Sequence, residues 1–293
     1  MKELKVKNRK NRVEEKSLTI TRNVVRIFLI IWSILIILPL LWTVLSSLKT
    51  NQEFGINAWS MPKKLQWVNY KDAWEGANFS KYFLNSLILS VGTVALSIIM
   101  TTTSAYVIGK FVHPVVKSIE VFYSIFMMVP QVLLLIPLFQ MCKKMNMTKS
   151  NVVLFTLMIT NALQGVPFYV FLLTPFMRGI NNSILEAAEI DGANQFQSFI
   201  TLVLPMVVPA IFMVGLLSFV GIWNEYIMSI TFIKDPAKYT LSAGINGLMN
   251  DSRAGYTLKF AALIIAMLPI LIIYAIFQKP LQNGLSSSDG VKG

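Results

Sequence analysis

Long apolar runs without a charged residue dominate this sequence. Six long stretches contain no Asp, Glu, Lys or Arg, at 27–48, 82–109, 121–142, 150–177, 192–224 and 260–278. The apolar part of the 192–224 stretch starts near Phe199. A helix of about 20 apolar residues crosses a hydrocarbon core of about 30 Å. The pattern therefore predicts an all-α integral membrane protein with six transmembrane helices.

Composition and charge agree with this fold class. Charged residues make up 14% of the chain and the mean hydropathy is +0.61, whereas a soluble domain carries about 25% charged residues. Much of the net charge of +12 lies in residues 1–26, ahead of the first apolar run. A basic segment in that place is a topology signal that keeps it in the cytoplasm, which is a better interpretation than nucleic-acid binding. Six spans then return the C-terminus to the cytoplasm.

The predicted spans divide the chain into three parts. We expect a basic cytoplasmic tail at 1–23, a six-helix membrane domain at 24–281 and a flexible Gly/Ser-rich cytoplasmic tail at 282–293. The N-terminal run is too long for a cleaved signal peptide, and no small-residue cleavage site follows it. Aromatic residues of the outer loop, 49–81, suit a membrane interface, where such rings collect.

Residue types needed for common catalytic and metal sites are scarce. The chain has one cysteine, Cys142, and one histidine, His113, which argues against a disulfide framework or a Cys/His metal cluster. Gly109-Lys110 lacks the remaining residues of a phosphate-binding loop. We therefore expect no ATPase activity, catalytic residue, cofactor or metal in this chain.

The segment 178–204 predicts a helical hairpin on the cytoplasmic face. Ser183 is the expected N-cap, with Glu186 at capping-box distance. Gly192 is the expected left-handed stop. Asn194 or Gln195 starts a second helix that continues into the fifth span. The first of these helices is short and rich in small and acidic residues, which suits docking into a groove on another protein.

These residues resemble a known loop. The combination is Glu186-Ala187-Ala188, Asp191-Gly192-Ala193, Phe199 and Leu204-Pro205. Residues and spacing are similar to the EAA loop of importer-type ABC permeases, in a cytoplasmic loop that precedes a membrane helix.

The resemblance extends over most of the chain and is greatest to the carbohydrate-uptake branch, in particular its smaller, maltose-type subunit. Its further matches are Ser47, Lys49, Pro62, Leu65, Asn69, Tyr70, Asn85-Ser86, Trp223-Asn224-Glu225-Tyr226, Gln278-Lys279 and 290–293. The segments 280–283 and 286–289 depart from the family pattern, which leaves the contacts of the tail open.

The resemblance implies a set of partners in the bacterial inner membrane. A second, homologous permease subunit would complete the pathway, two copies of a cytoplasmic ATPase would bind ATP and Mg, and an extracytoplasmic sugar-binding protein would deliver the substrate. The coupling residues that it implies are Glu186, Ala187, Ala188, Asp191, Gly192, Ala193, Leu204 and Pro205. Glu186 would pair with a basic residue of the ATPase.

Polar residues within the spans are candidates for the substrate pathway. They are Asn85, Ser86, Gln131, Asn161, Gln164, Asn224 and Glu225. The alternative for each polar residue is a hydrogen bond between helices, worth about 0.6 kcal/mol on average. Glu225 is either an interfacial structural residue or part of a gate, depending on where the fifth helix begins.

Two other function classes are alternatives. A secondary transporter or channel would work without an ATPase, but it usually carries internal repeats and intramembrane charges, and the centres of these spans have no such charges. An intramembrane enzyme would need catalytic residues that are missing. Co-purification with a second permease and an ATPase separates the first interpretation from both.

Overall fold

The computed structural model describes the backbone of residues 2–289; side chains are described within 21–278, Ala77 excepted. Every regular element in this part of the chain is helical. The elements are α1 (Lys2–Ser47), α2 (Asn51–Ile56), α3 (Val68–Glu75), η1 (Gly76–Asn78), α4 (Phe79–Lys110), α5 (Pro114–Met127), α6 (Gln131–Lys144), α7 (Val153–Gly179), α8 (Asn182–Ile190), α9 (Gln195–Ser198), the π-helical turn η2 (Phe199–Val203), α10 (Leu204–Met206), α11 (Val208–Trp223), α12 (Ile227–Phe232), η3 (Pro236–Lys238), α13 (Leu241–Asn250) and α14 (Tyr256–Asp289).

Four helices among the described residues are long and apolar enough to cross a membrane. They are Thr21–Ser47 of α1, α4, α7 and Tyr256–Gln278 of α14. Two bent pairs, α5 with α6 and α9–α10 with α11, reach the same threshold when each pair is counted as one span. The prediction of an all-α membrane fold is confirmed, and the count reaches six only if both bent pairs span.

The third and fifth spans are not the continuous helices that the apolar runs indicated. The α5–α6 pair bends by 100° between Met127 and Gln131. Pro130 has no N–H, and its ring disfavours helical geometry at Val129. The fifth span bends by 77° at Val207, just before Pro209, whose ring would clash with the carbonyl four residues earlier in a straight helix.

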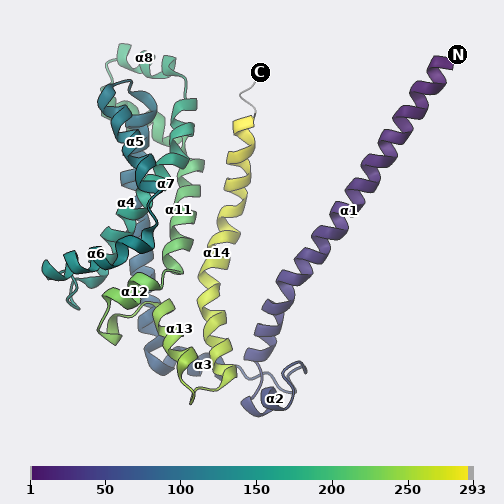
Figure 1. The fold of residues 1–293 in the computed structure, drawn as a ribbon, viewed down its shortest axis with the longest axis vertical. Helices are drawn as coiled ribbons and strands as arrows, with labels where there is room; N and C mark the ends of the chain where they lie inside the picture. Colours follow the sequence, from purple (N-terminus) through teal and green to yellow (C-terminus); the bar gives the residue numbers. More distant parts are fainter. Residues whose placement is uncertain (1, 290–293) are drawn as a thin grey trace. The chain divides into compact units, whose positions relative to one another are not determined.

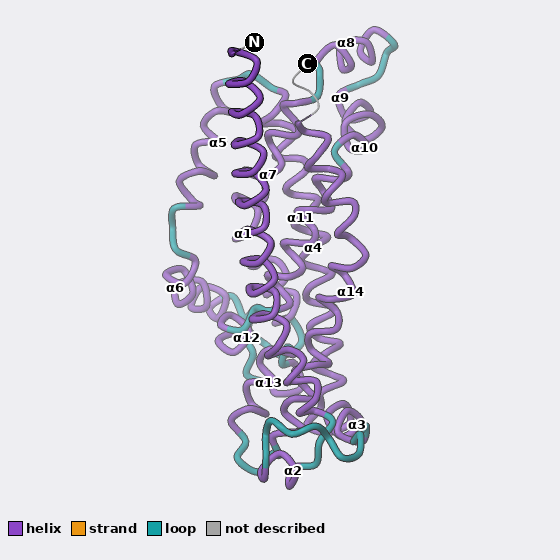
Figure 2. The backbone as a smooth tube through the Cα atoms, turned by 90° about the vertical axis from the view of Figure 1, so that its right-hand side faces the viewer, coloured by secondary structure: helices purple, strands orange, loops and turns teal. Residues whose placement is uncertain are grey.

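The chain forms two compact units. The first contains residues 1–71 and 255–264; the second contains 72–254 and the chain from 265 onward. In the second unit α4, α7 and α11 run side by side, with α8 at one end and α12 and α13 at the other (Figure 1, Figure 2). Helix α14 continues past Leu281 to Asp289, so the predicted tail at 282–293 begins within a helix. The family-like ending, 290–293, lies outside the described residues.

Close packing of α4 on α7 forms the centre of the second unit. Gly109 lies against Met177 near one end and Gly92 against Met158 farther along, so the two helices run parallel. The fully buried hydroxyls on α4 are spaced as one helical face, and they have no hydrogen-bond partner among the described residues: Ser90, Thr93, Ser97 and Thr101. Small side chains of this kind let helices approach closely inside a membrane.

Helix α13 closes the end of the second unit opposite α8. Gly244 lies directly against the ring of buried Tyr82 on α4, where a Cβ atom would overlap the ring. Cys142 is buried beside Val153 and Leu157 in a nearby apolar cluster. Cys142 therefore packs as a small apolar residue near the C-terminal end of α6.

Candidate functional site

The segment 178–204 forms the predicted hairpin, and a glycine makes its turn. Helix α8 ends in a Schellman arrangement, in which the Ala193 N–H donates to the Ala188 carbonyl (2.9 Å) and the Gly192 N–H to the Glu189 carbonyl (3.0 Å). Gly192 has φ +87°, a left-handed conformation that favours glycine. The prediction of a glycine stop is confirmed.

The two helix starts of the hairpin are capped by asparagines. Asn181 is the N-cap of α8 and accepts a hydrogen bond from the Ser183 N–H at 3.1 Å. The expected N-cap at Ser183 was therefore wrong by two positions. Asn194 caps α9 in a full capping box with Gln197, which confirms the predicted start of the second helix. Side-chain hydrogen bonds thus determine where each helix of the hairpin begins.

The tip of the hairpin is acidic with two large apolar side chains. Glu186 and Asp191 are exposed. Ile190 is 86% exposed and Phe196 is 72% exposed. Among the other predicted coupling residues, Ala187 and Pro205 are exposed, Ala193 and Leu204 are half-buried, and Ala188 is buried. Exposed apolar side chains of this size beside acidic residues suit an interaction surface. Sequence reasoning did not single out Ile190 or Phe196.

Residues from α4 hold both arms of the hairpin. The Lys110 ammonium group donates to the Ile180 carbonyl and to Asn182 Oδ1 (3.0 Å) at the start of α8. On the other arm, Tyr106 donates its hydroxyl proton to Gln195 Oε1 at 3.1 Å. The Tyr106 ring also packs on Phe199, with ring centroids 4.8 Å apart. The end of α4 therefore fixes the hairpin to the helix bundle.

A π-helical turn connects the hairpin to the fifth span. Within Phe199–Val203 the Leu204 N–H donates to the Phe199 carbonyl, one residue farther back than in an α-helix. Pro205 follows and has no N–H to continue the α-helical pattern. Phe199, Val203 and Val207 are buried in one cluster with Leu173 and Met177 of α7. The connection is thus irregular in its hydrogen bonds but well packed.

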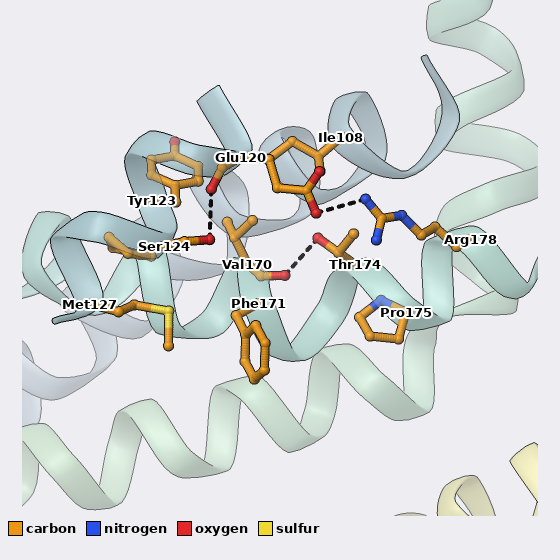
Figure 3. Close-up of a pocket in the computed structure, with 11 residues that line it drawn as sticks. Ile108, Glu120, Tyr123, Ser124, Met127, Val170, Phe171, Thr174, Pro175 and Arg178 are labelled. Atoms are coloured by element: carbon orange, nitrogen blue, oxygen red, sulfur yellow. Dashed lines mark hydrogen bonds and ion pairs between the residues drawn. The ribbon is translucent and has the colours of Figure 1, made fainter. Parts of the chain in front are cut away.

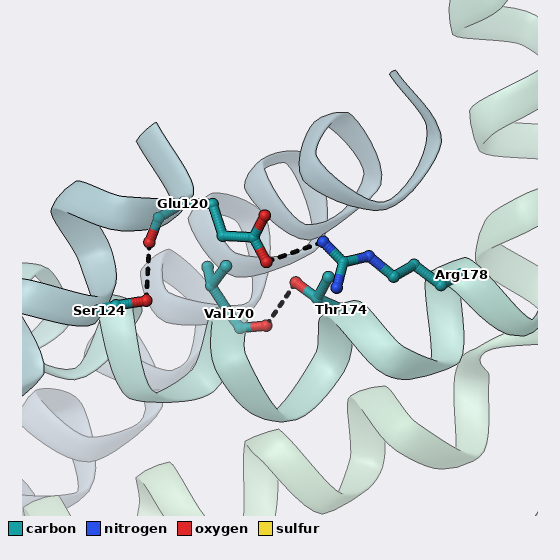
Figure 4. A network of polar contacts seen from close by, with 5 residues as sticks. All are labelled: Glu120, Ser124, Val170, Thr174 and Arg178. Atoms are coloured by element: carbon teal, nitrogen blue, oxygen red, sulfur yellow. Dashed lines mark hydrogen bonds and ion pairs between the residues drawn. The ribbon is translucent and has the colours of Figure 1, made fainter. Parts of the chain in front are cut away.

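An ion pair joins α5 to α7 beside this hairpin. Arg178 donates to Glu120 at 2.8 Å (Figure 4). The pair borders a cavity of about 110 Å³, also lined by Tyr123, Phe171 and Pro175 (Figure 3). Both charged side chains are about half exposed, 51% and 41%, and pairs of this kind contribute roughly 0.2–1 kcal/mol. Arg178 is thus paired with α5 rather than with an acidic residue of the hairpin.

Two of the pathway candidates make structural hydrogen bonds at the opposite end of the second unit. Asn85 donates to the carbonyls of Ala237 and Tyr239, both at 3.0 Å. Ser86 accepts from the Leu241 N–H at 2.7 Å. Both side chains are buried. They anchor the segment before α13 to α4.

A second group of candidates meets around α12. Gln131 donates to the Gln164 carbonyl (3.4 Å), and Gln164 contacts Met228 Sδ (3.7 Å). Glu225 accepts from the N–H groups of Met228 (2.6 Å) and Ser229 (3.0 Å). Glu225 therefore caps α12, which favours the structural alternative for this residue.

The last two candidates bond within their own helices. Asn161 is buried and donates to the Leu157 carbonyl at 2.8 Å, and exposed Asn224 donates to the Val220 carbonyl at 2.8 Å. Of the seven candidates, the structure brings Gln131, Gln164 and Glu225 together around α12 and leaves Asn85 and Ser86 in a separate contact.

Known proteins share this sequence and fold. Residues 102–287 match the family described as "Binding-protein-dependent transport system inner membrane component". The diacetylchitobiose uptake system permease protein of Streptomyces coelicolor is 31% identical over 88% of this chain and 85% of its own length. The melibiose/raffinose/stachyose import permease protein of Bacillus subtilis is 29% identical over 85% and 88%.

A solved structure agrees with the sequence relatives. One chain of a bacterial ABC transporter involved in the import of the acidic polysaccharide alginate superposes with a TM-score of 0.78 at 19% identity, covering 89% of this chain and 96% of that one. The fold is therefore shared, and the family match includes the hairpin, the π-helical turn and α4 from Thr102 onward. This chain belongs to the integral inner-membrane components of binding-protein-dependent transport systems.

Proposed function

We propose that this chain is a permease subunit of an ATP-driven importer and forms half of the translocation pathway for a sugar or oligosaccharide. The hairpin carries this proposal, because its exposed acidic and apolar tip is fixed to the bundle at both arms. Relatives named for diacetylchitobiose and for melibiose, raffinose and stachyose support a carbohydrate substrate.

The tip would dock in a groove of a cytoplasmic ATPase. Ile190 and Phe196 supply apolar anchors, and Glu186 supplies the charge for a basic residue of that partner. Displacement of the tip passes to α4 through Lys110 and Tyr106, and to the fifth span through the π-helical turn. Coupling between distant sites needs such an element with defined contacts to both.

The remaining partners follow from this role. A second permease subunit would complete the pathway, two ATPase subunits would bind ATP and Mg, and an extracytoplasmic sugar-binding protein would present the substrate. Two solved alginate transporter structures, one of them in complex with a pentasaccharide-bound periplasmic protein, support this assembly. Both termini of the chain would lie in the cytoplasm, on the side of the hairpin.

The group around α12 is the better substrate contact among the candidates. Gln131 is exposed and Gln164 is partly exposed, so both retain hydrogen-bonding capacity for sugar hydroxyls. Exposed Asn224 adjoins the Glu225 cap. Asn85, Ser86 and Asn161 already have protein partners, which favours a scaffold role for them.

Co-purification and uptake test the proposal. The chain, expressed with its neighbouring genes, should purify with a second permease and an ATPase, and should support uptake of one member of a panel of mono- and oligosaccharides. A Glu186→Lys, Gly192→Val double variant should abolish uptake while inserting normally. Glu75→Lys, an exposed charge reversal on α3, is the control. Full uptake by the double variant would refute the coupling role, and purification as a lone carrier would favour a secondary transporter.

A further inference from the structure

The loop after α1 folds back onto the helix that precedes it. Asn69 Nδ2 donates to the carbonyls of Ser47 (2.7 Å) and Lys49 (2.8 Å). The Tyr70 hydroxyl bonds with Ser47 Oγ at 2.6 Å. The Gln66 N–H donates to the Leu48 carbonyl at 3.0 Å. The far end of the loop is thus tied to the last turn of a candidate membrane span.

The middle of the loop reaches deeper along the same span. Trp42 Nε1 donates to the Ala58 carbonyl at 3.1 Å. Trp42 lies five positions before the helix end at Ser47 (47 − 42), which is about 7.5 Å along a helix axis at about 1.5 Å per residue. The rings of Trp42 and Trp59 are 5.4 Å apart. Trp59 is therefore held near a residue inside the apolar run.

A buried lysine keeps this arrangement closed. Lys49 is 1% exposed, and its ammonium group donates to the carbonyls of Ala58 (2.8 Å) and Asn57 (3.5 Å). A buried ammonium group needs such acceptors, because an unpaired one is costly. The Ala58 carbonyl thus receives two side-chain donors, one from Lys49 and one from Trp42. These bonds fix the depth of the loop relative to α1.

Large apolar side chains on this loop remain uncovered. The set, here called the loop patch, consists of Ile56 (87% exposed), Trp59 (74%), Met61 (72%) and Trp67 (64%). Two exposed lysines, Lys63 and Lys64, lie between its members in sequence. Two other aromatic residues of the outer loop are not available to the interface in this way, because Phe79 is buried and the Tyr70 hydroxyl is bonded to α1.

We propose that the loop patch inserts into the lipid interface at the C-terminal end of α1, with Lys63 and Lys64 binding the phosphates of anionic phospholipids. The patch is continuous with the apolar surface of α1, because Trp59 packs on Trp42 of that helix. Tryptophan is enriched at the headgroup level, and lysines beside it attract anionic lipid.

A lipid partner explains the observations better than a protein partner. The Trp42–Ala58 and Asn69–Ser47 hydrogen bonds connect the loop to the end of a membrane span, which sets the depth of the patch at the bilayer surface whatever the chain assembles with. A soluble partner would have to reach Trp59 at the level of Trp42. The two adjacent lysines, Lys63 and Lys64, also fit a layer of phosphates, since the segment 54–68 has no acidic residue that could neutralise them.

Spin labels test the depth of the patch. In a Cys142→Ala background, cysteines would replace Trp59, Met61, Leu41 and Ser252 in turn, with the full chain in phospholipid vesicles. Leu41 is an exposed residue of the α1 span and Ser252 an exposed polar turn residue. Labels at positions 59 and 61 should collide more often with oxygen than with a water-soluble nickel chelate, as the label at position 41 does. The label at position 252 should show the opposite preference. The proposal fails if the labels at 59 and 61 behave like the label at 252, or if both reagents are excluded, which would indicate a protein cover.

Fluorescence quenching tests the lipid class. The difference between the native chain and a Trp59→Phe, Trp67→Phe variant isolates the two rings. Brominated phosphatidylglycerol should quench this signal more than brominated phosphatidylcholine at equal mole fraction. Lys63→Gln and Lys64→Gln should each lower that preference about fivefold, and Lys117→Gln on α5 should leave it unchanged. Equal quenching by both lipids would overturn the phosphate contact, and no quenching would overturn the insertion.

Discussion

Replacing Lys110 by methionine should loosen the hairpin without unfolding the bundle. The substitution keeps the length of the side chain and removes its bonds to the Ile180 carbonyl and Asn182 Oδ1. Hydrogen bonds to a charged group contribute about 1.5–3 kcal/mol. Lys110 is only partly buried, so solvent screening reduces the loss to about 1–2 kcal/mol. That difference raises the open population of the hairpin roughly 5- to 30-fold.

Hydrogen–deuterium exchange measures this population directly. Amides in 181–195 should exchange roughly 5- to 30-fold faster in Lys110→Met, because opening precedes exchange, while amides in the middle of α7 keep their native rates. Lys117→Met is the matched control, since this exposed lysine lies on α5 outside the hairpin contacts. Unchanged exchange in 181–195, or an equal increase in the control, would refute the assignment of Lys110 as the residue that fixes α8.

Three further predictions concern single positions. At Gly192 a Cβ atom has open space, so only the φ of +87° opposes a side chain. Hydrogen–deuterium exchange at the tip should become faster in the order Gly192→Asn, Gly192→Ala, Gly192→Val, with the alanine variant costing about 1–2 kcal/mol. Equal exchange rates in the three variants would contradict this. Gly244→Ala should destabilise the protein by about 1–3 kcal/mol, seen as a lower melting temperature in detergent, because its Cβ would overlap the ring of Tyr82. Gly247→Ala, where the Cβ has open space, should leave the melting temperature unchanged. The Ser150 hydroxyl and a backbone N–H hold the pKa of Asp235 below its usual value, so the stabilisation from these bonds is present above about pH 4 and is lost as pH falls through the lower folded pKa. Chemical-shift titration of Asp235 should therefore show a higher pKa in a Ser150→Ala chain than in the native chain. An unchanged pKa would exclude the contact.

Local signals in the sequence predicted local structure well. Charge-free runs located the apolar helices, because hydrocarbon tolerates few charges anywhere along a span. Gly192 was found because a left-handed residue after a helix strongly favours glycine. The predicted helix start at Asn194 coincides with a capping box whose residues lie three positions apart, whereas the expected cap of α8 at Ser183 was two positions too late. In each case the interacting atoms lie within one or two helical turns.

Contacts between distant segments could not be predicted from one sequence. Lys110 bonds to a residue 70 positions later and Tyr106 to one 89 positions later, and no residue near either one signals its partner. The apolar run at 121–142 also concealed a 100° bend, since proline within a membrane helix is often compatible with a modest kink. Glu225 resembles an intramembrane charge in the sequence, whereas the structure places the N–H groups of α12 beside it.

The buried hydroxyl row on α4 has a mechanical consequence. In the described chain no side-chain hydrogen bond joins α4 to α7, although the two helices pack closely along their length. Small displacements between them break no specific bond and cost only dispersion contacts, which each contribute about 0.1–0.2 kcal/mol. Resistance to sliding therefore comes from side-chain packing, except next to Lys110, whose hydrogen bonds fix the end of α4 to the start of α8.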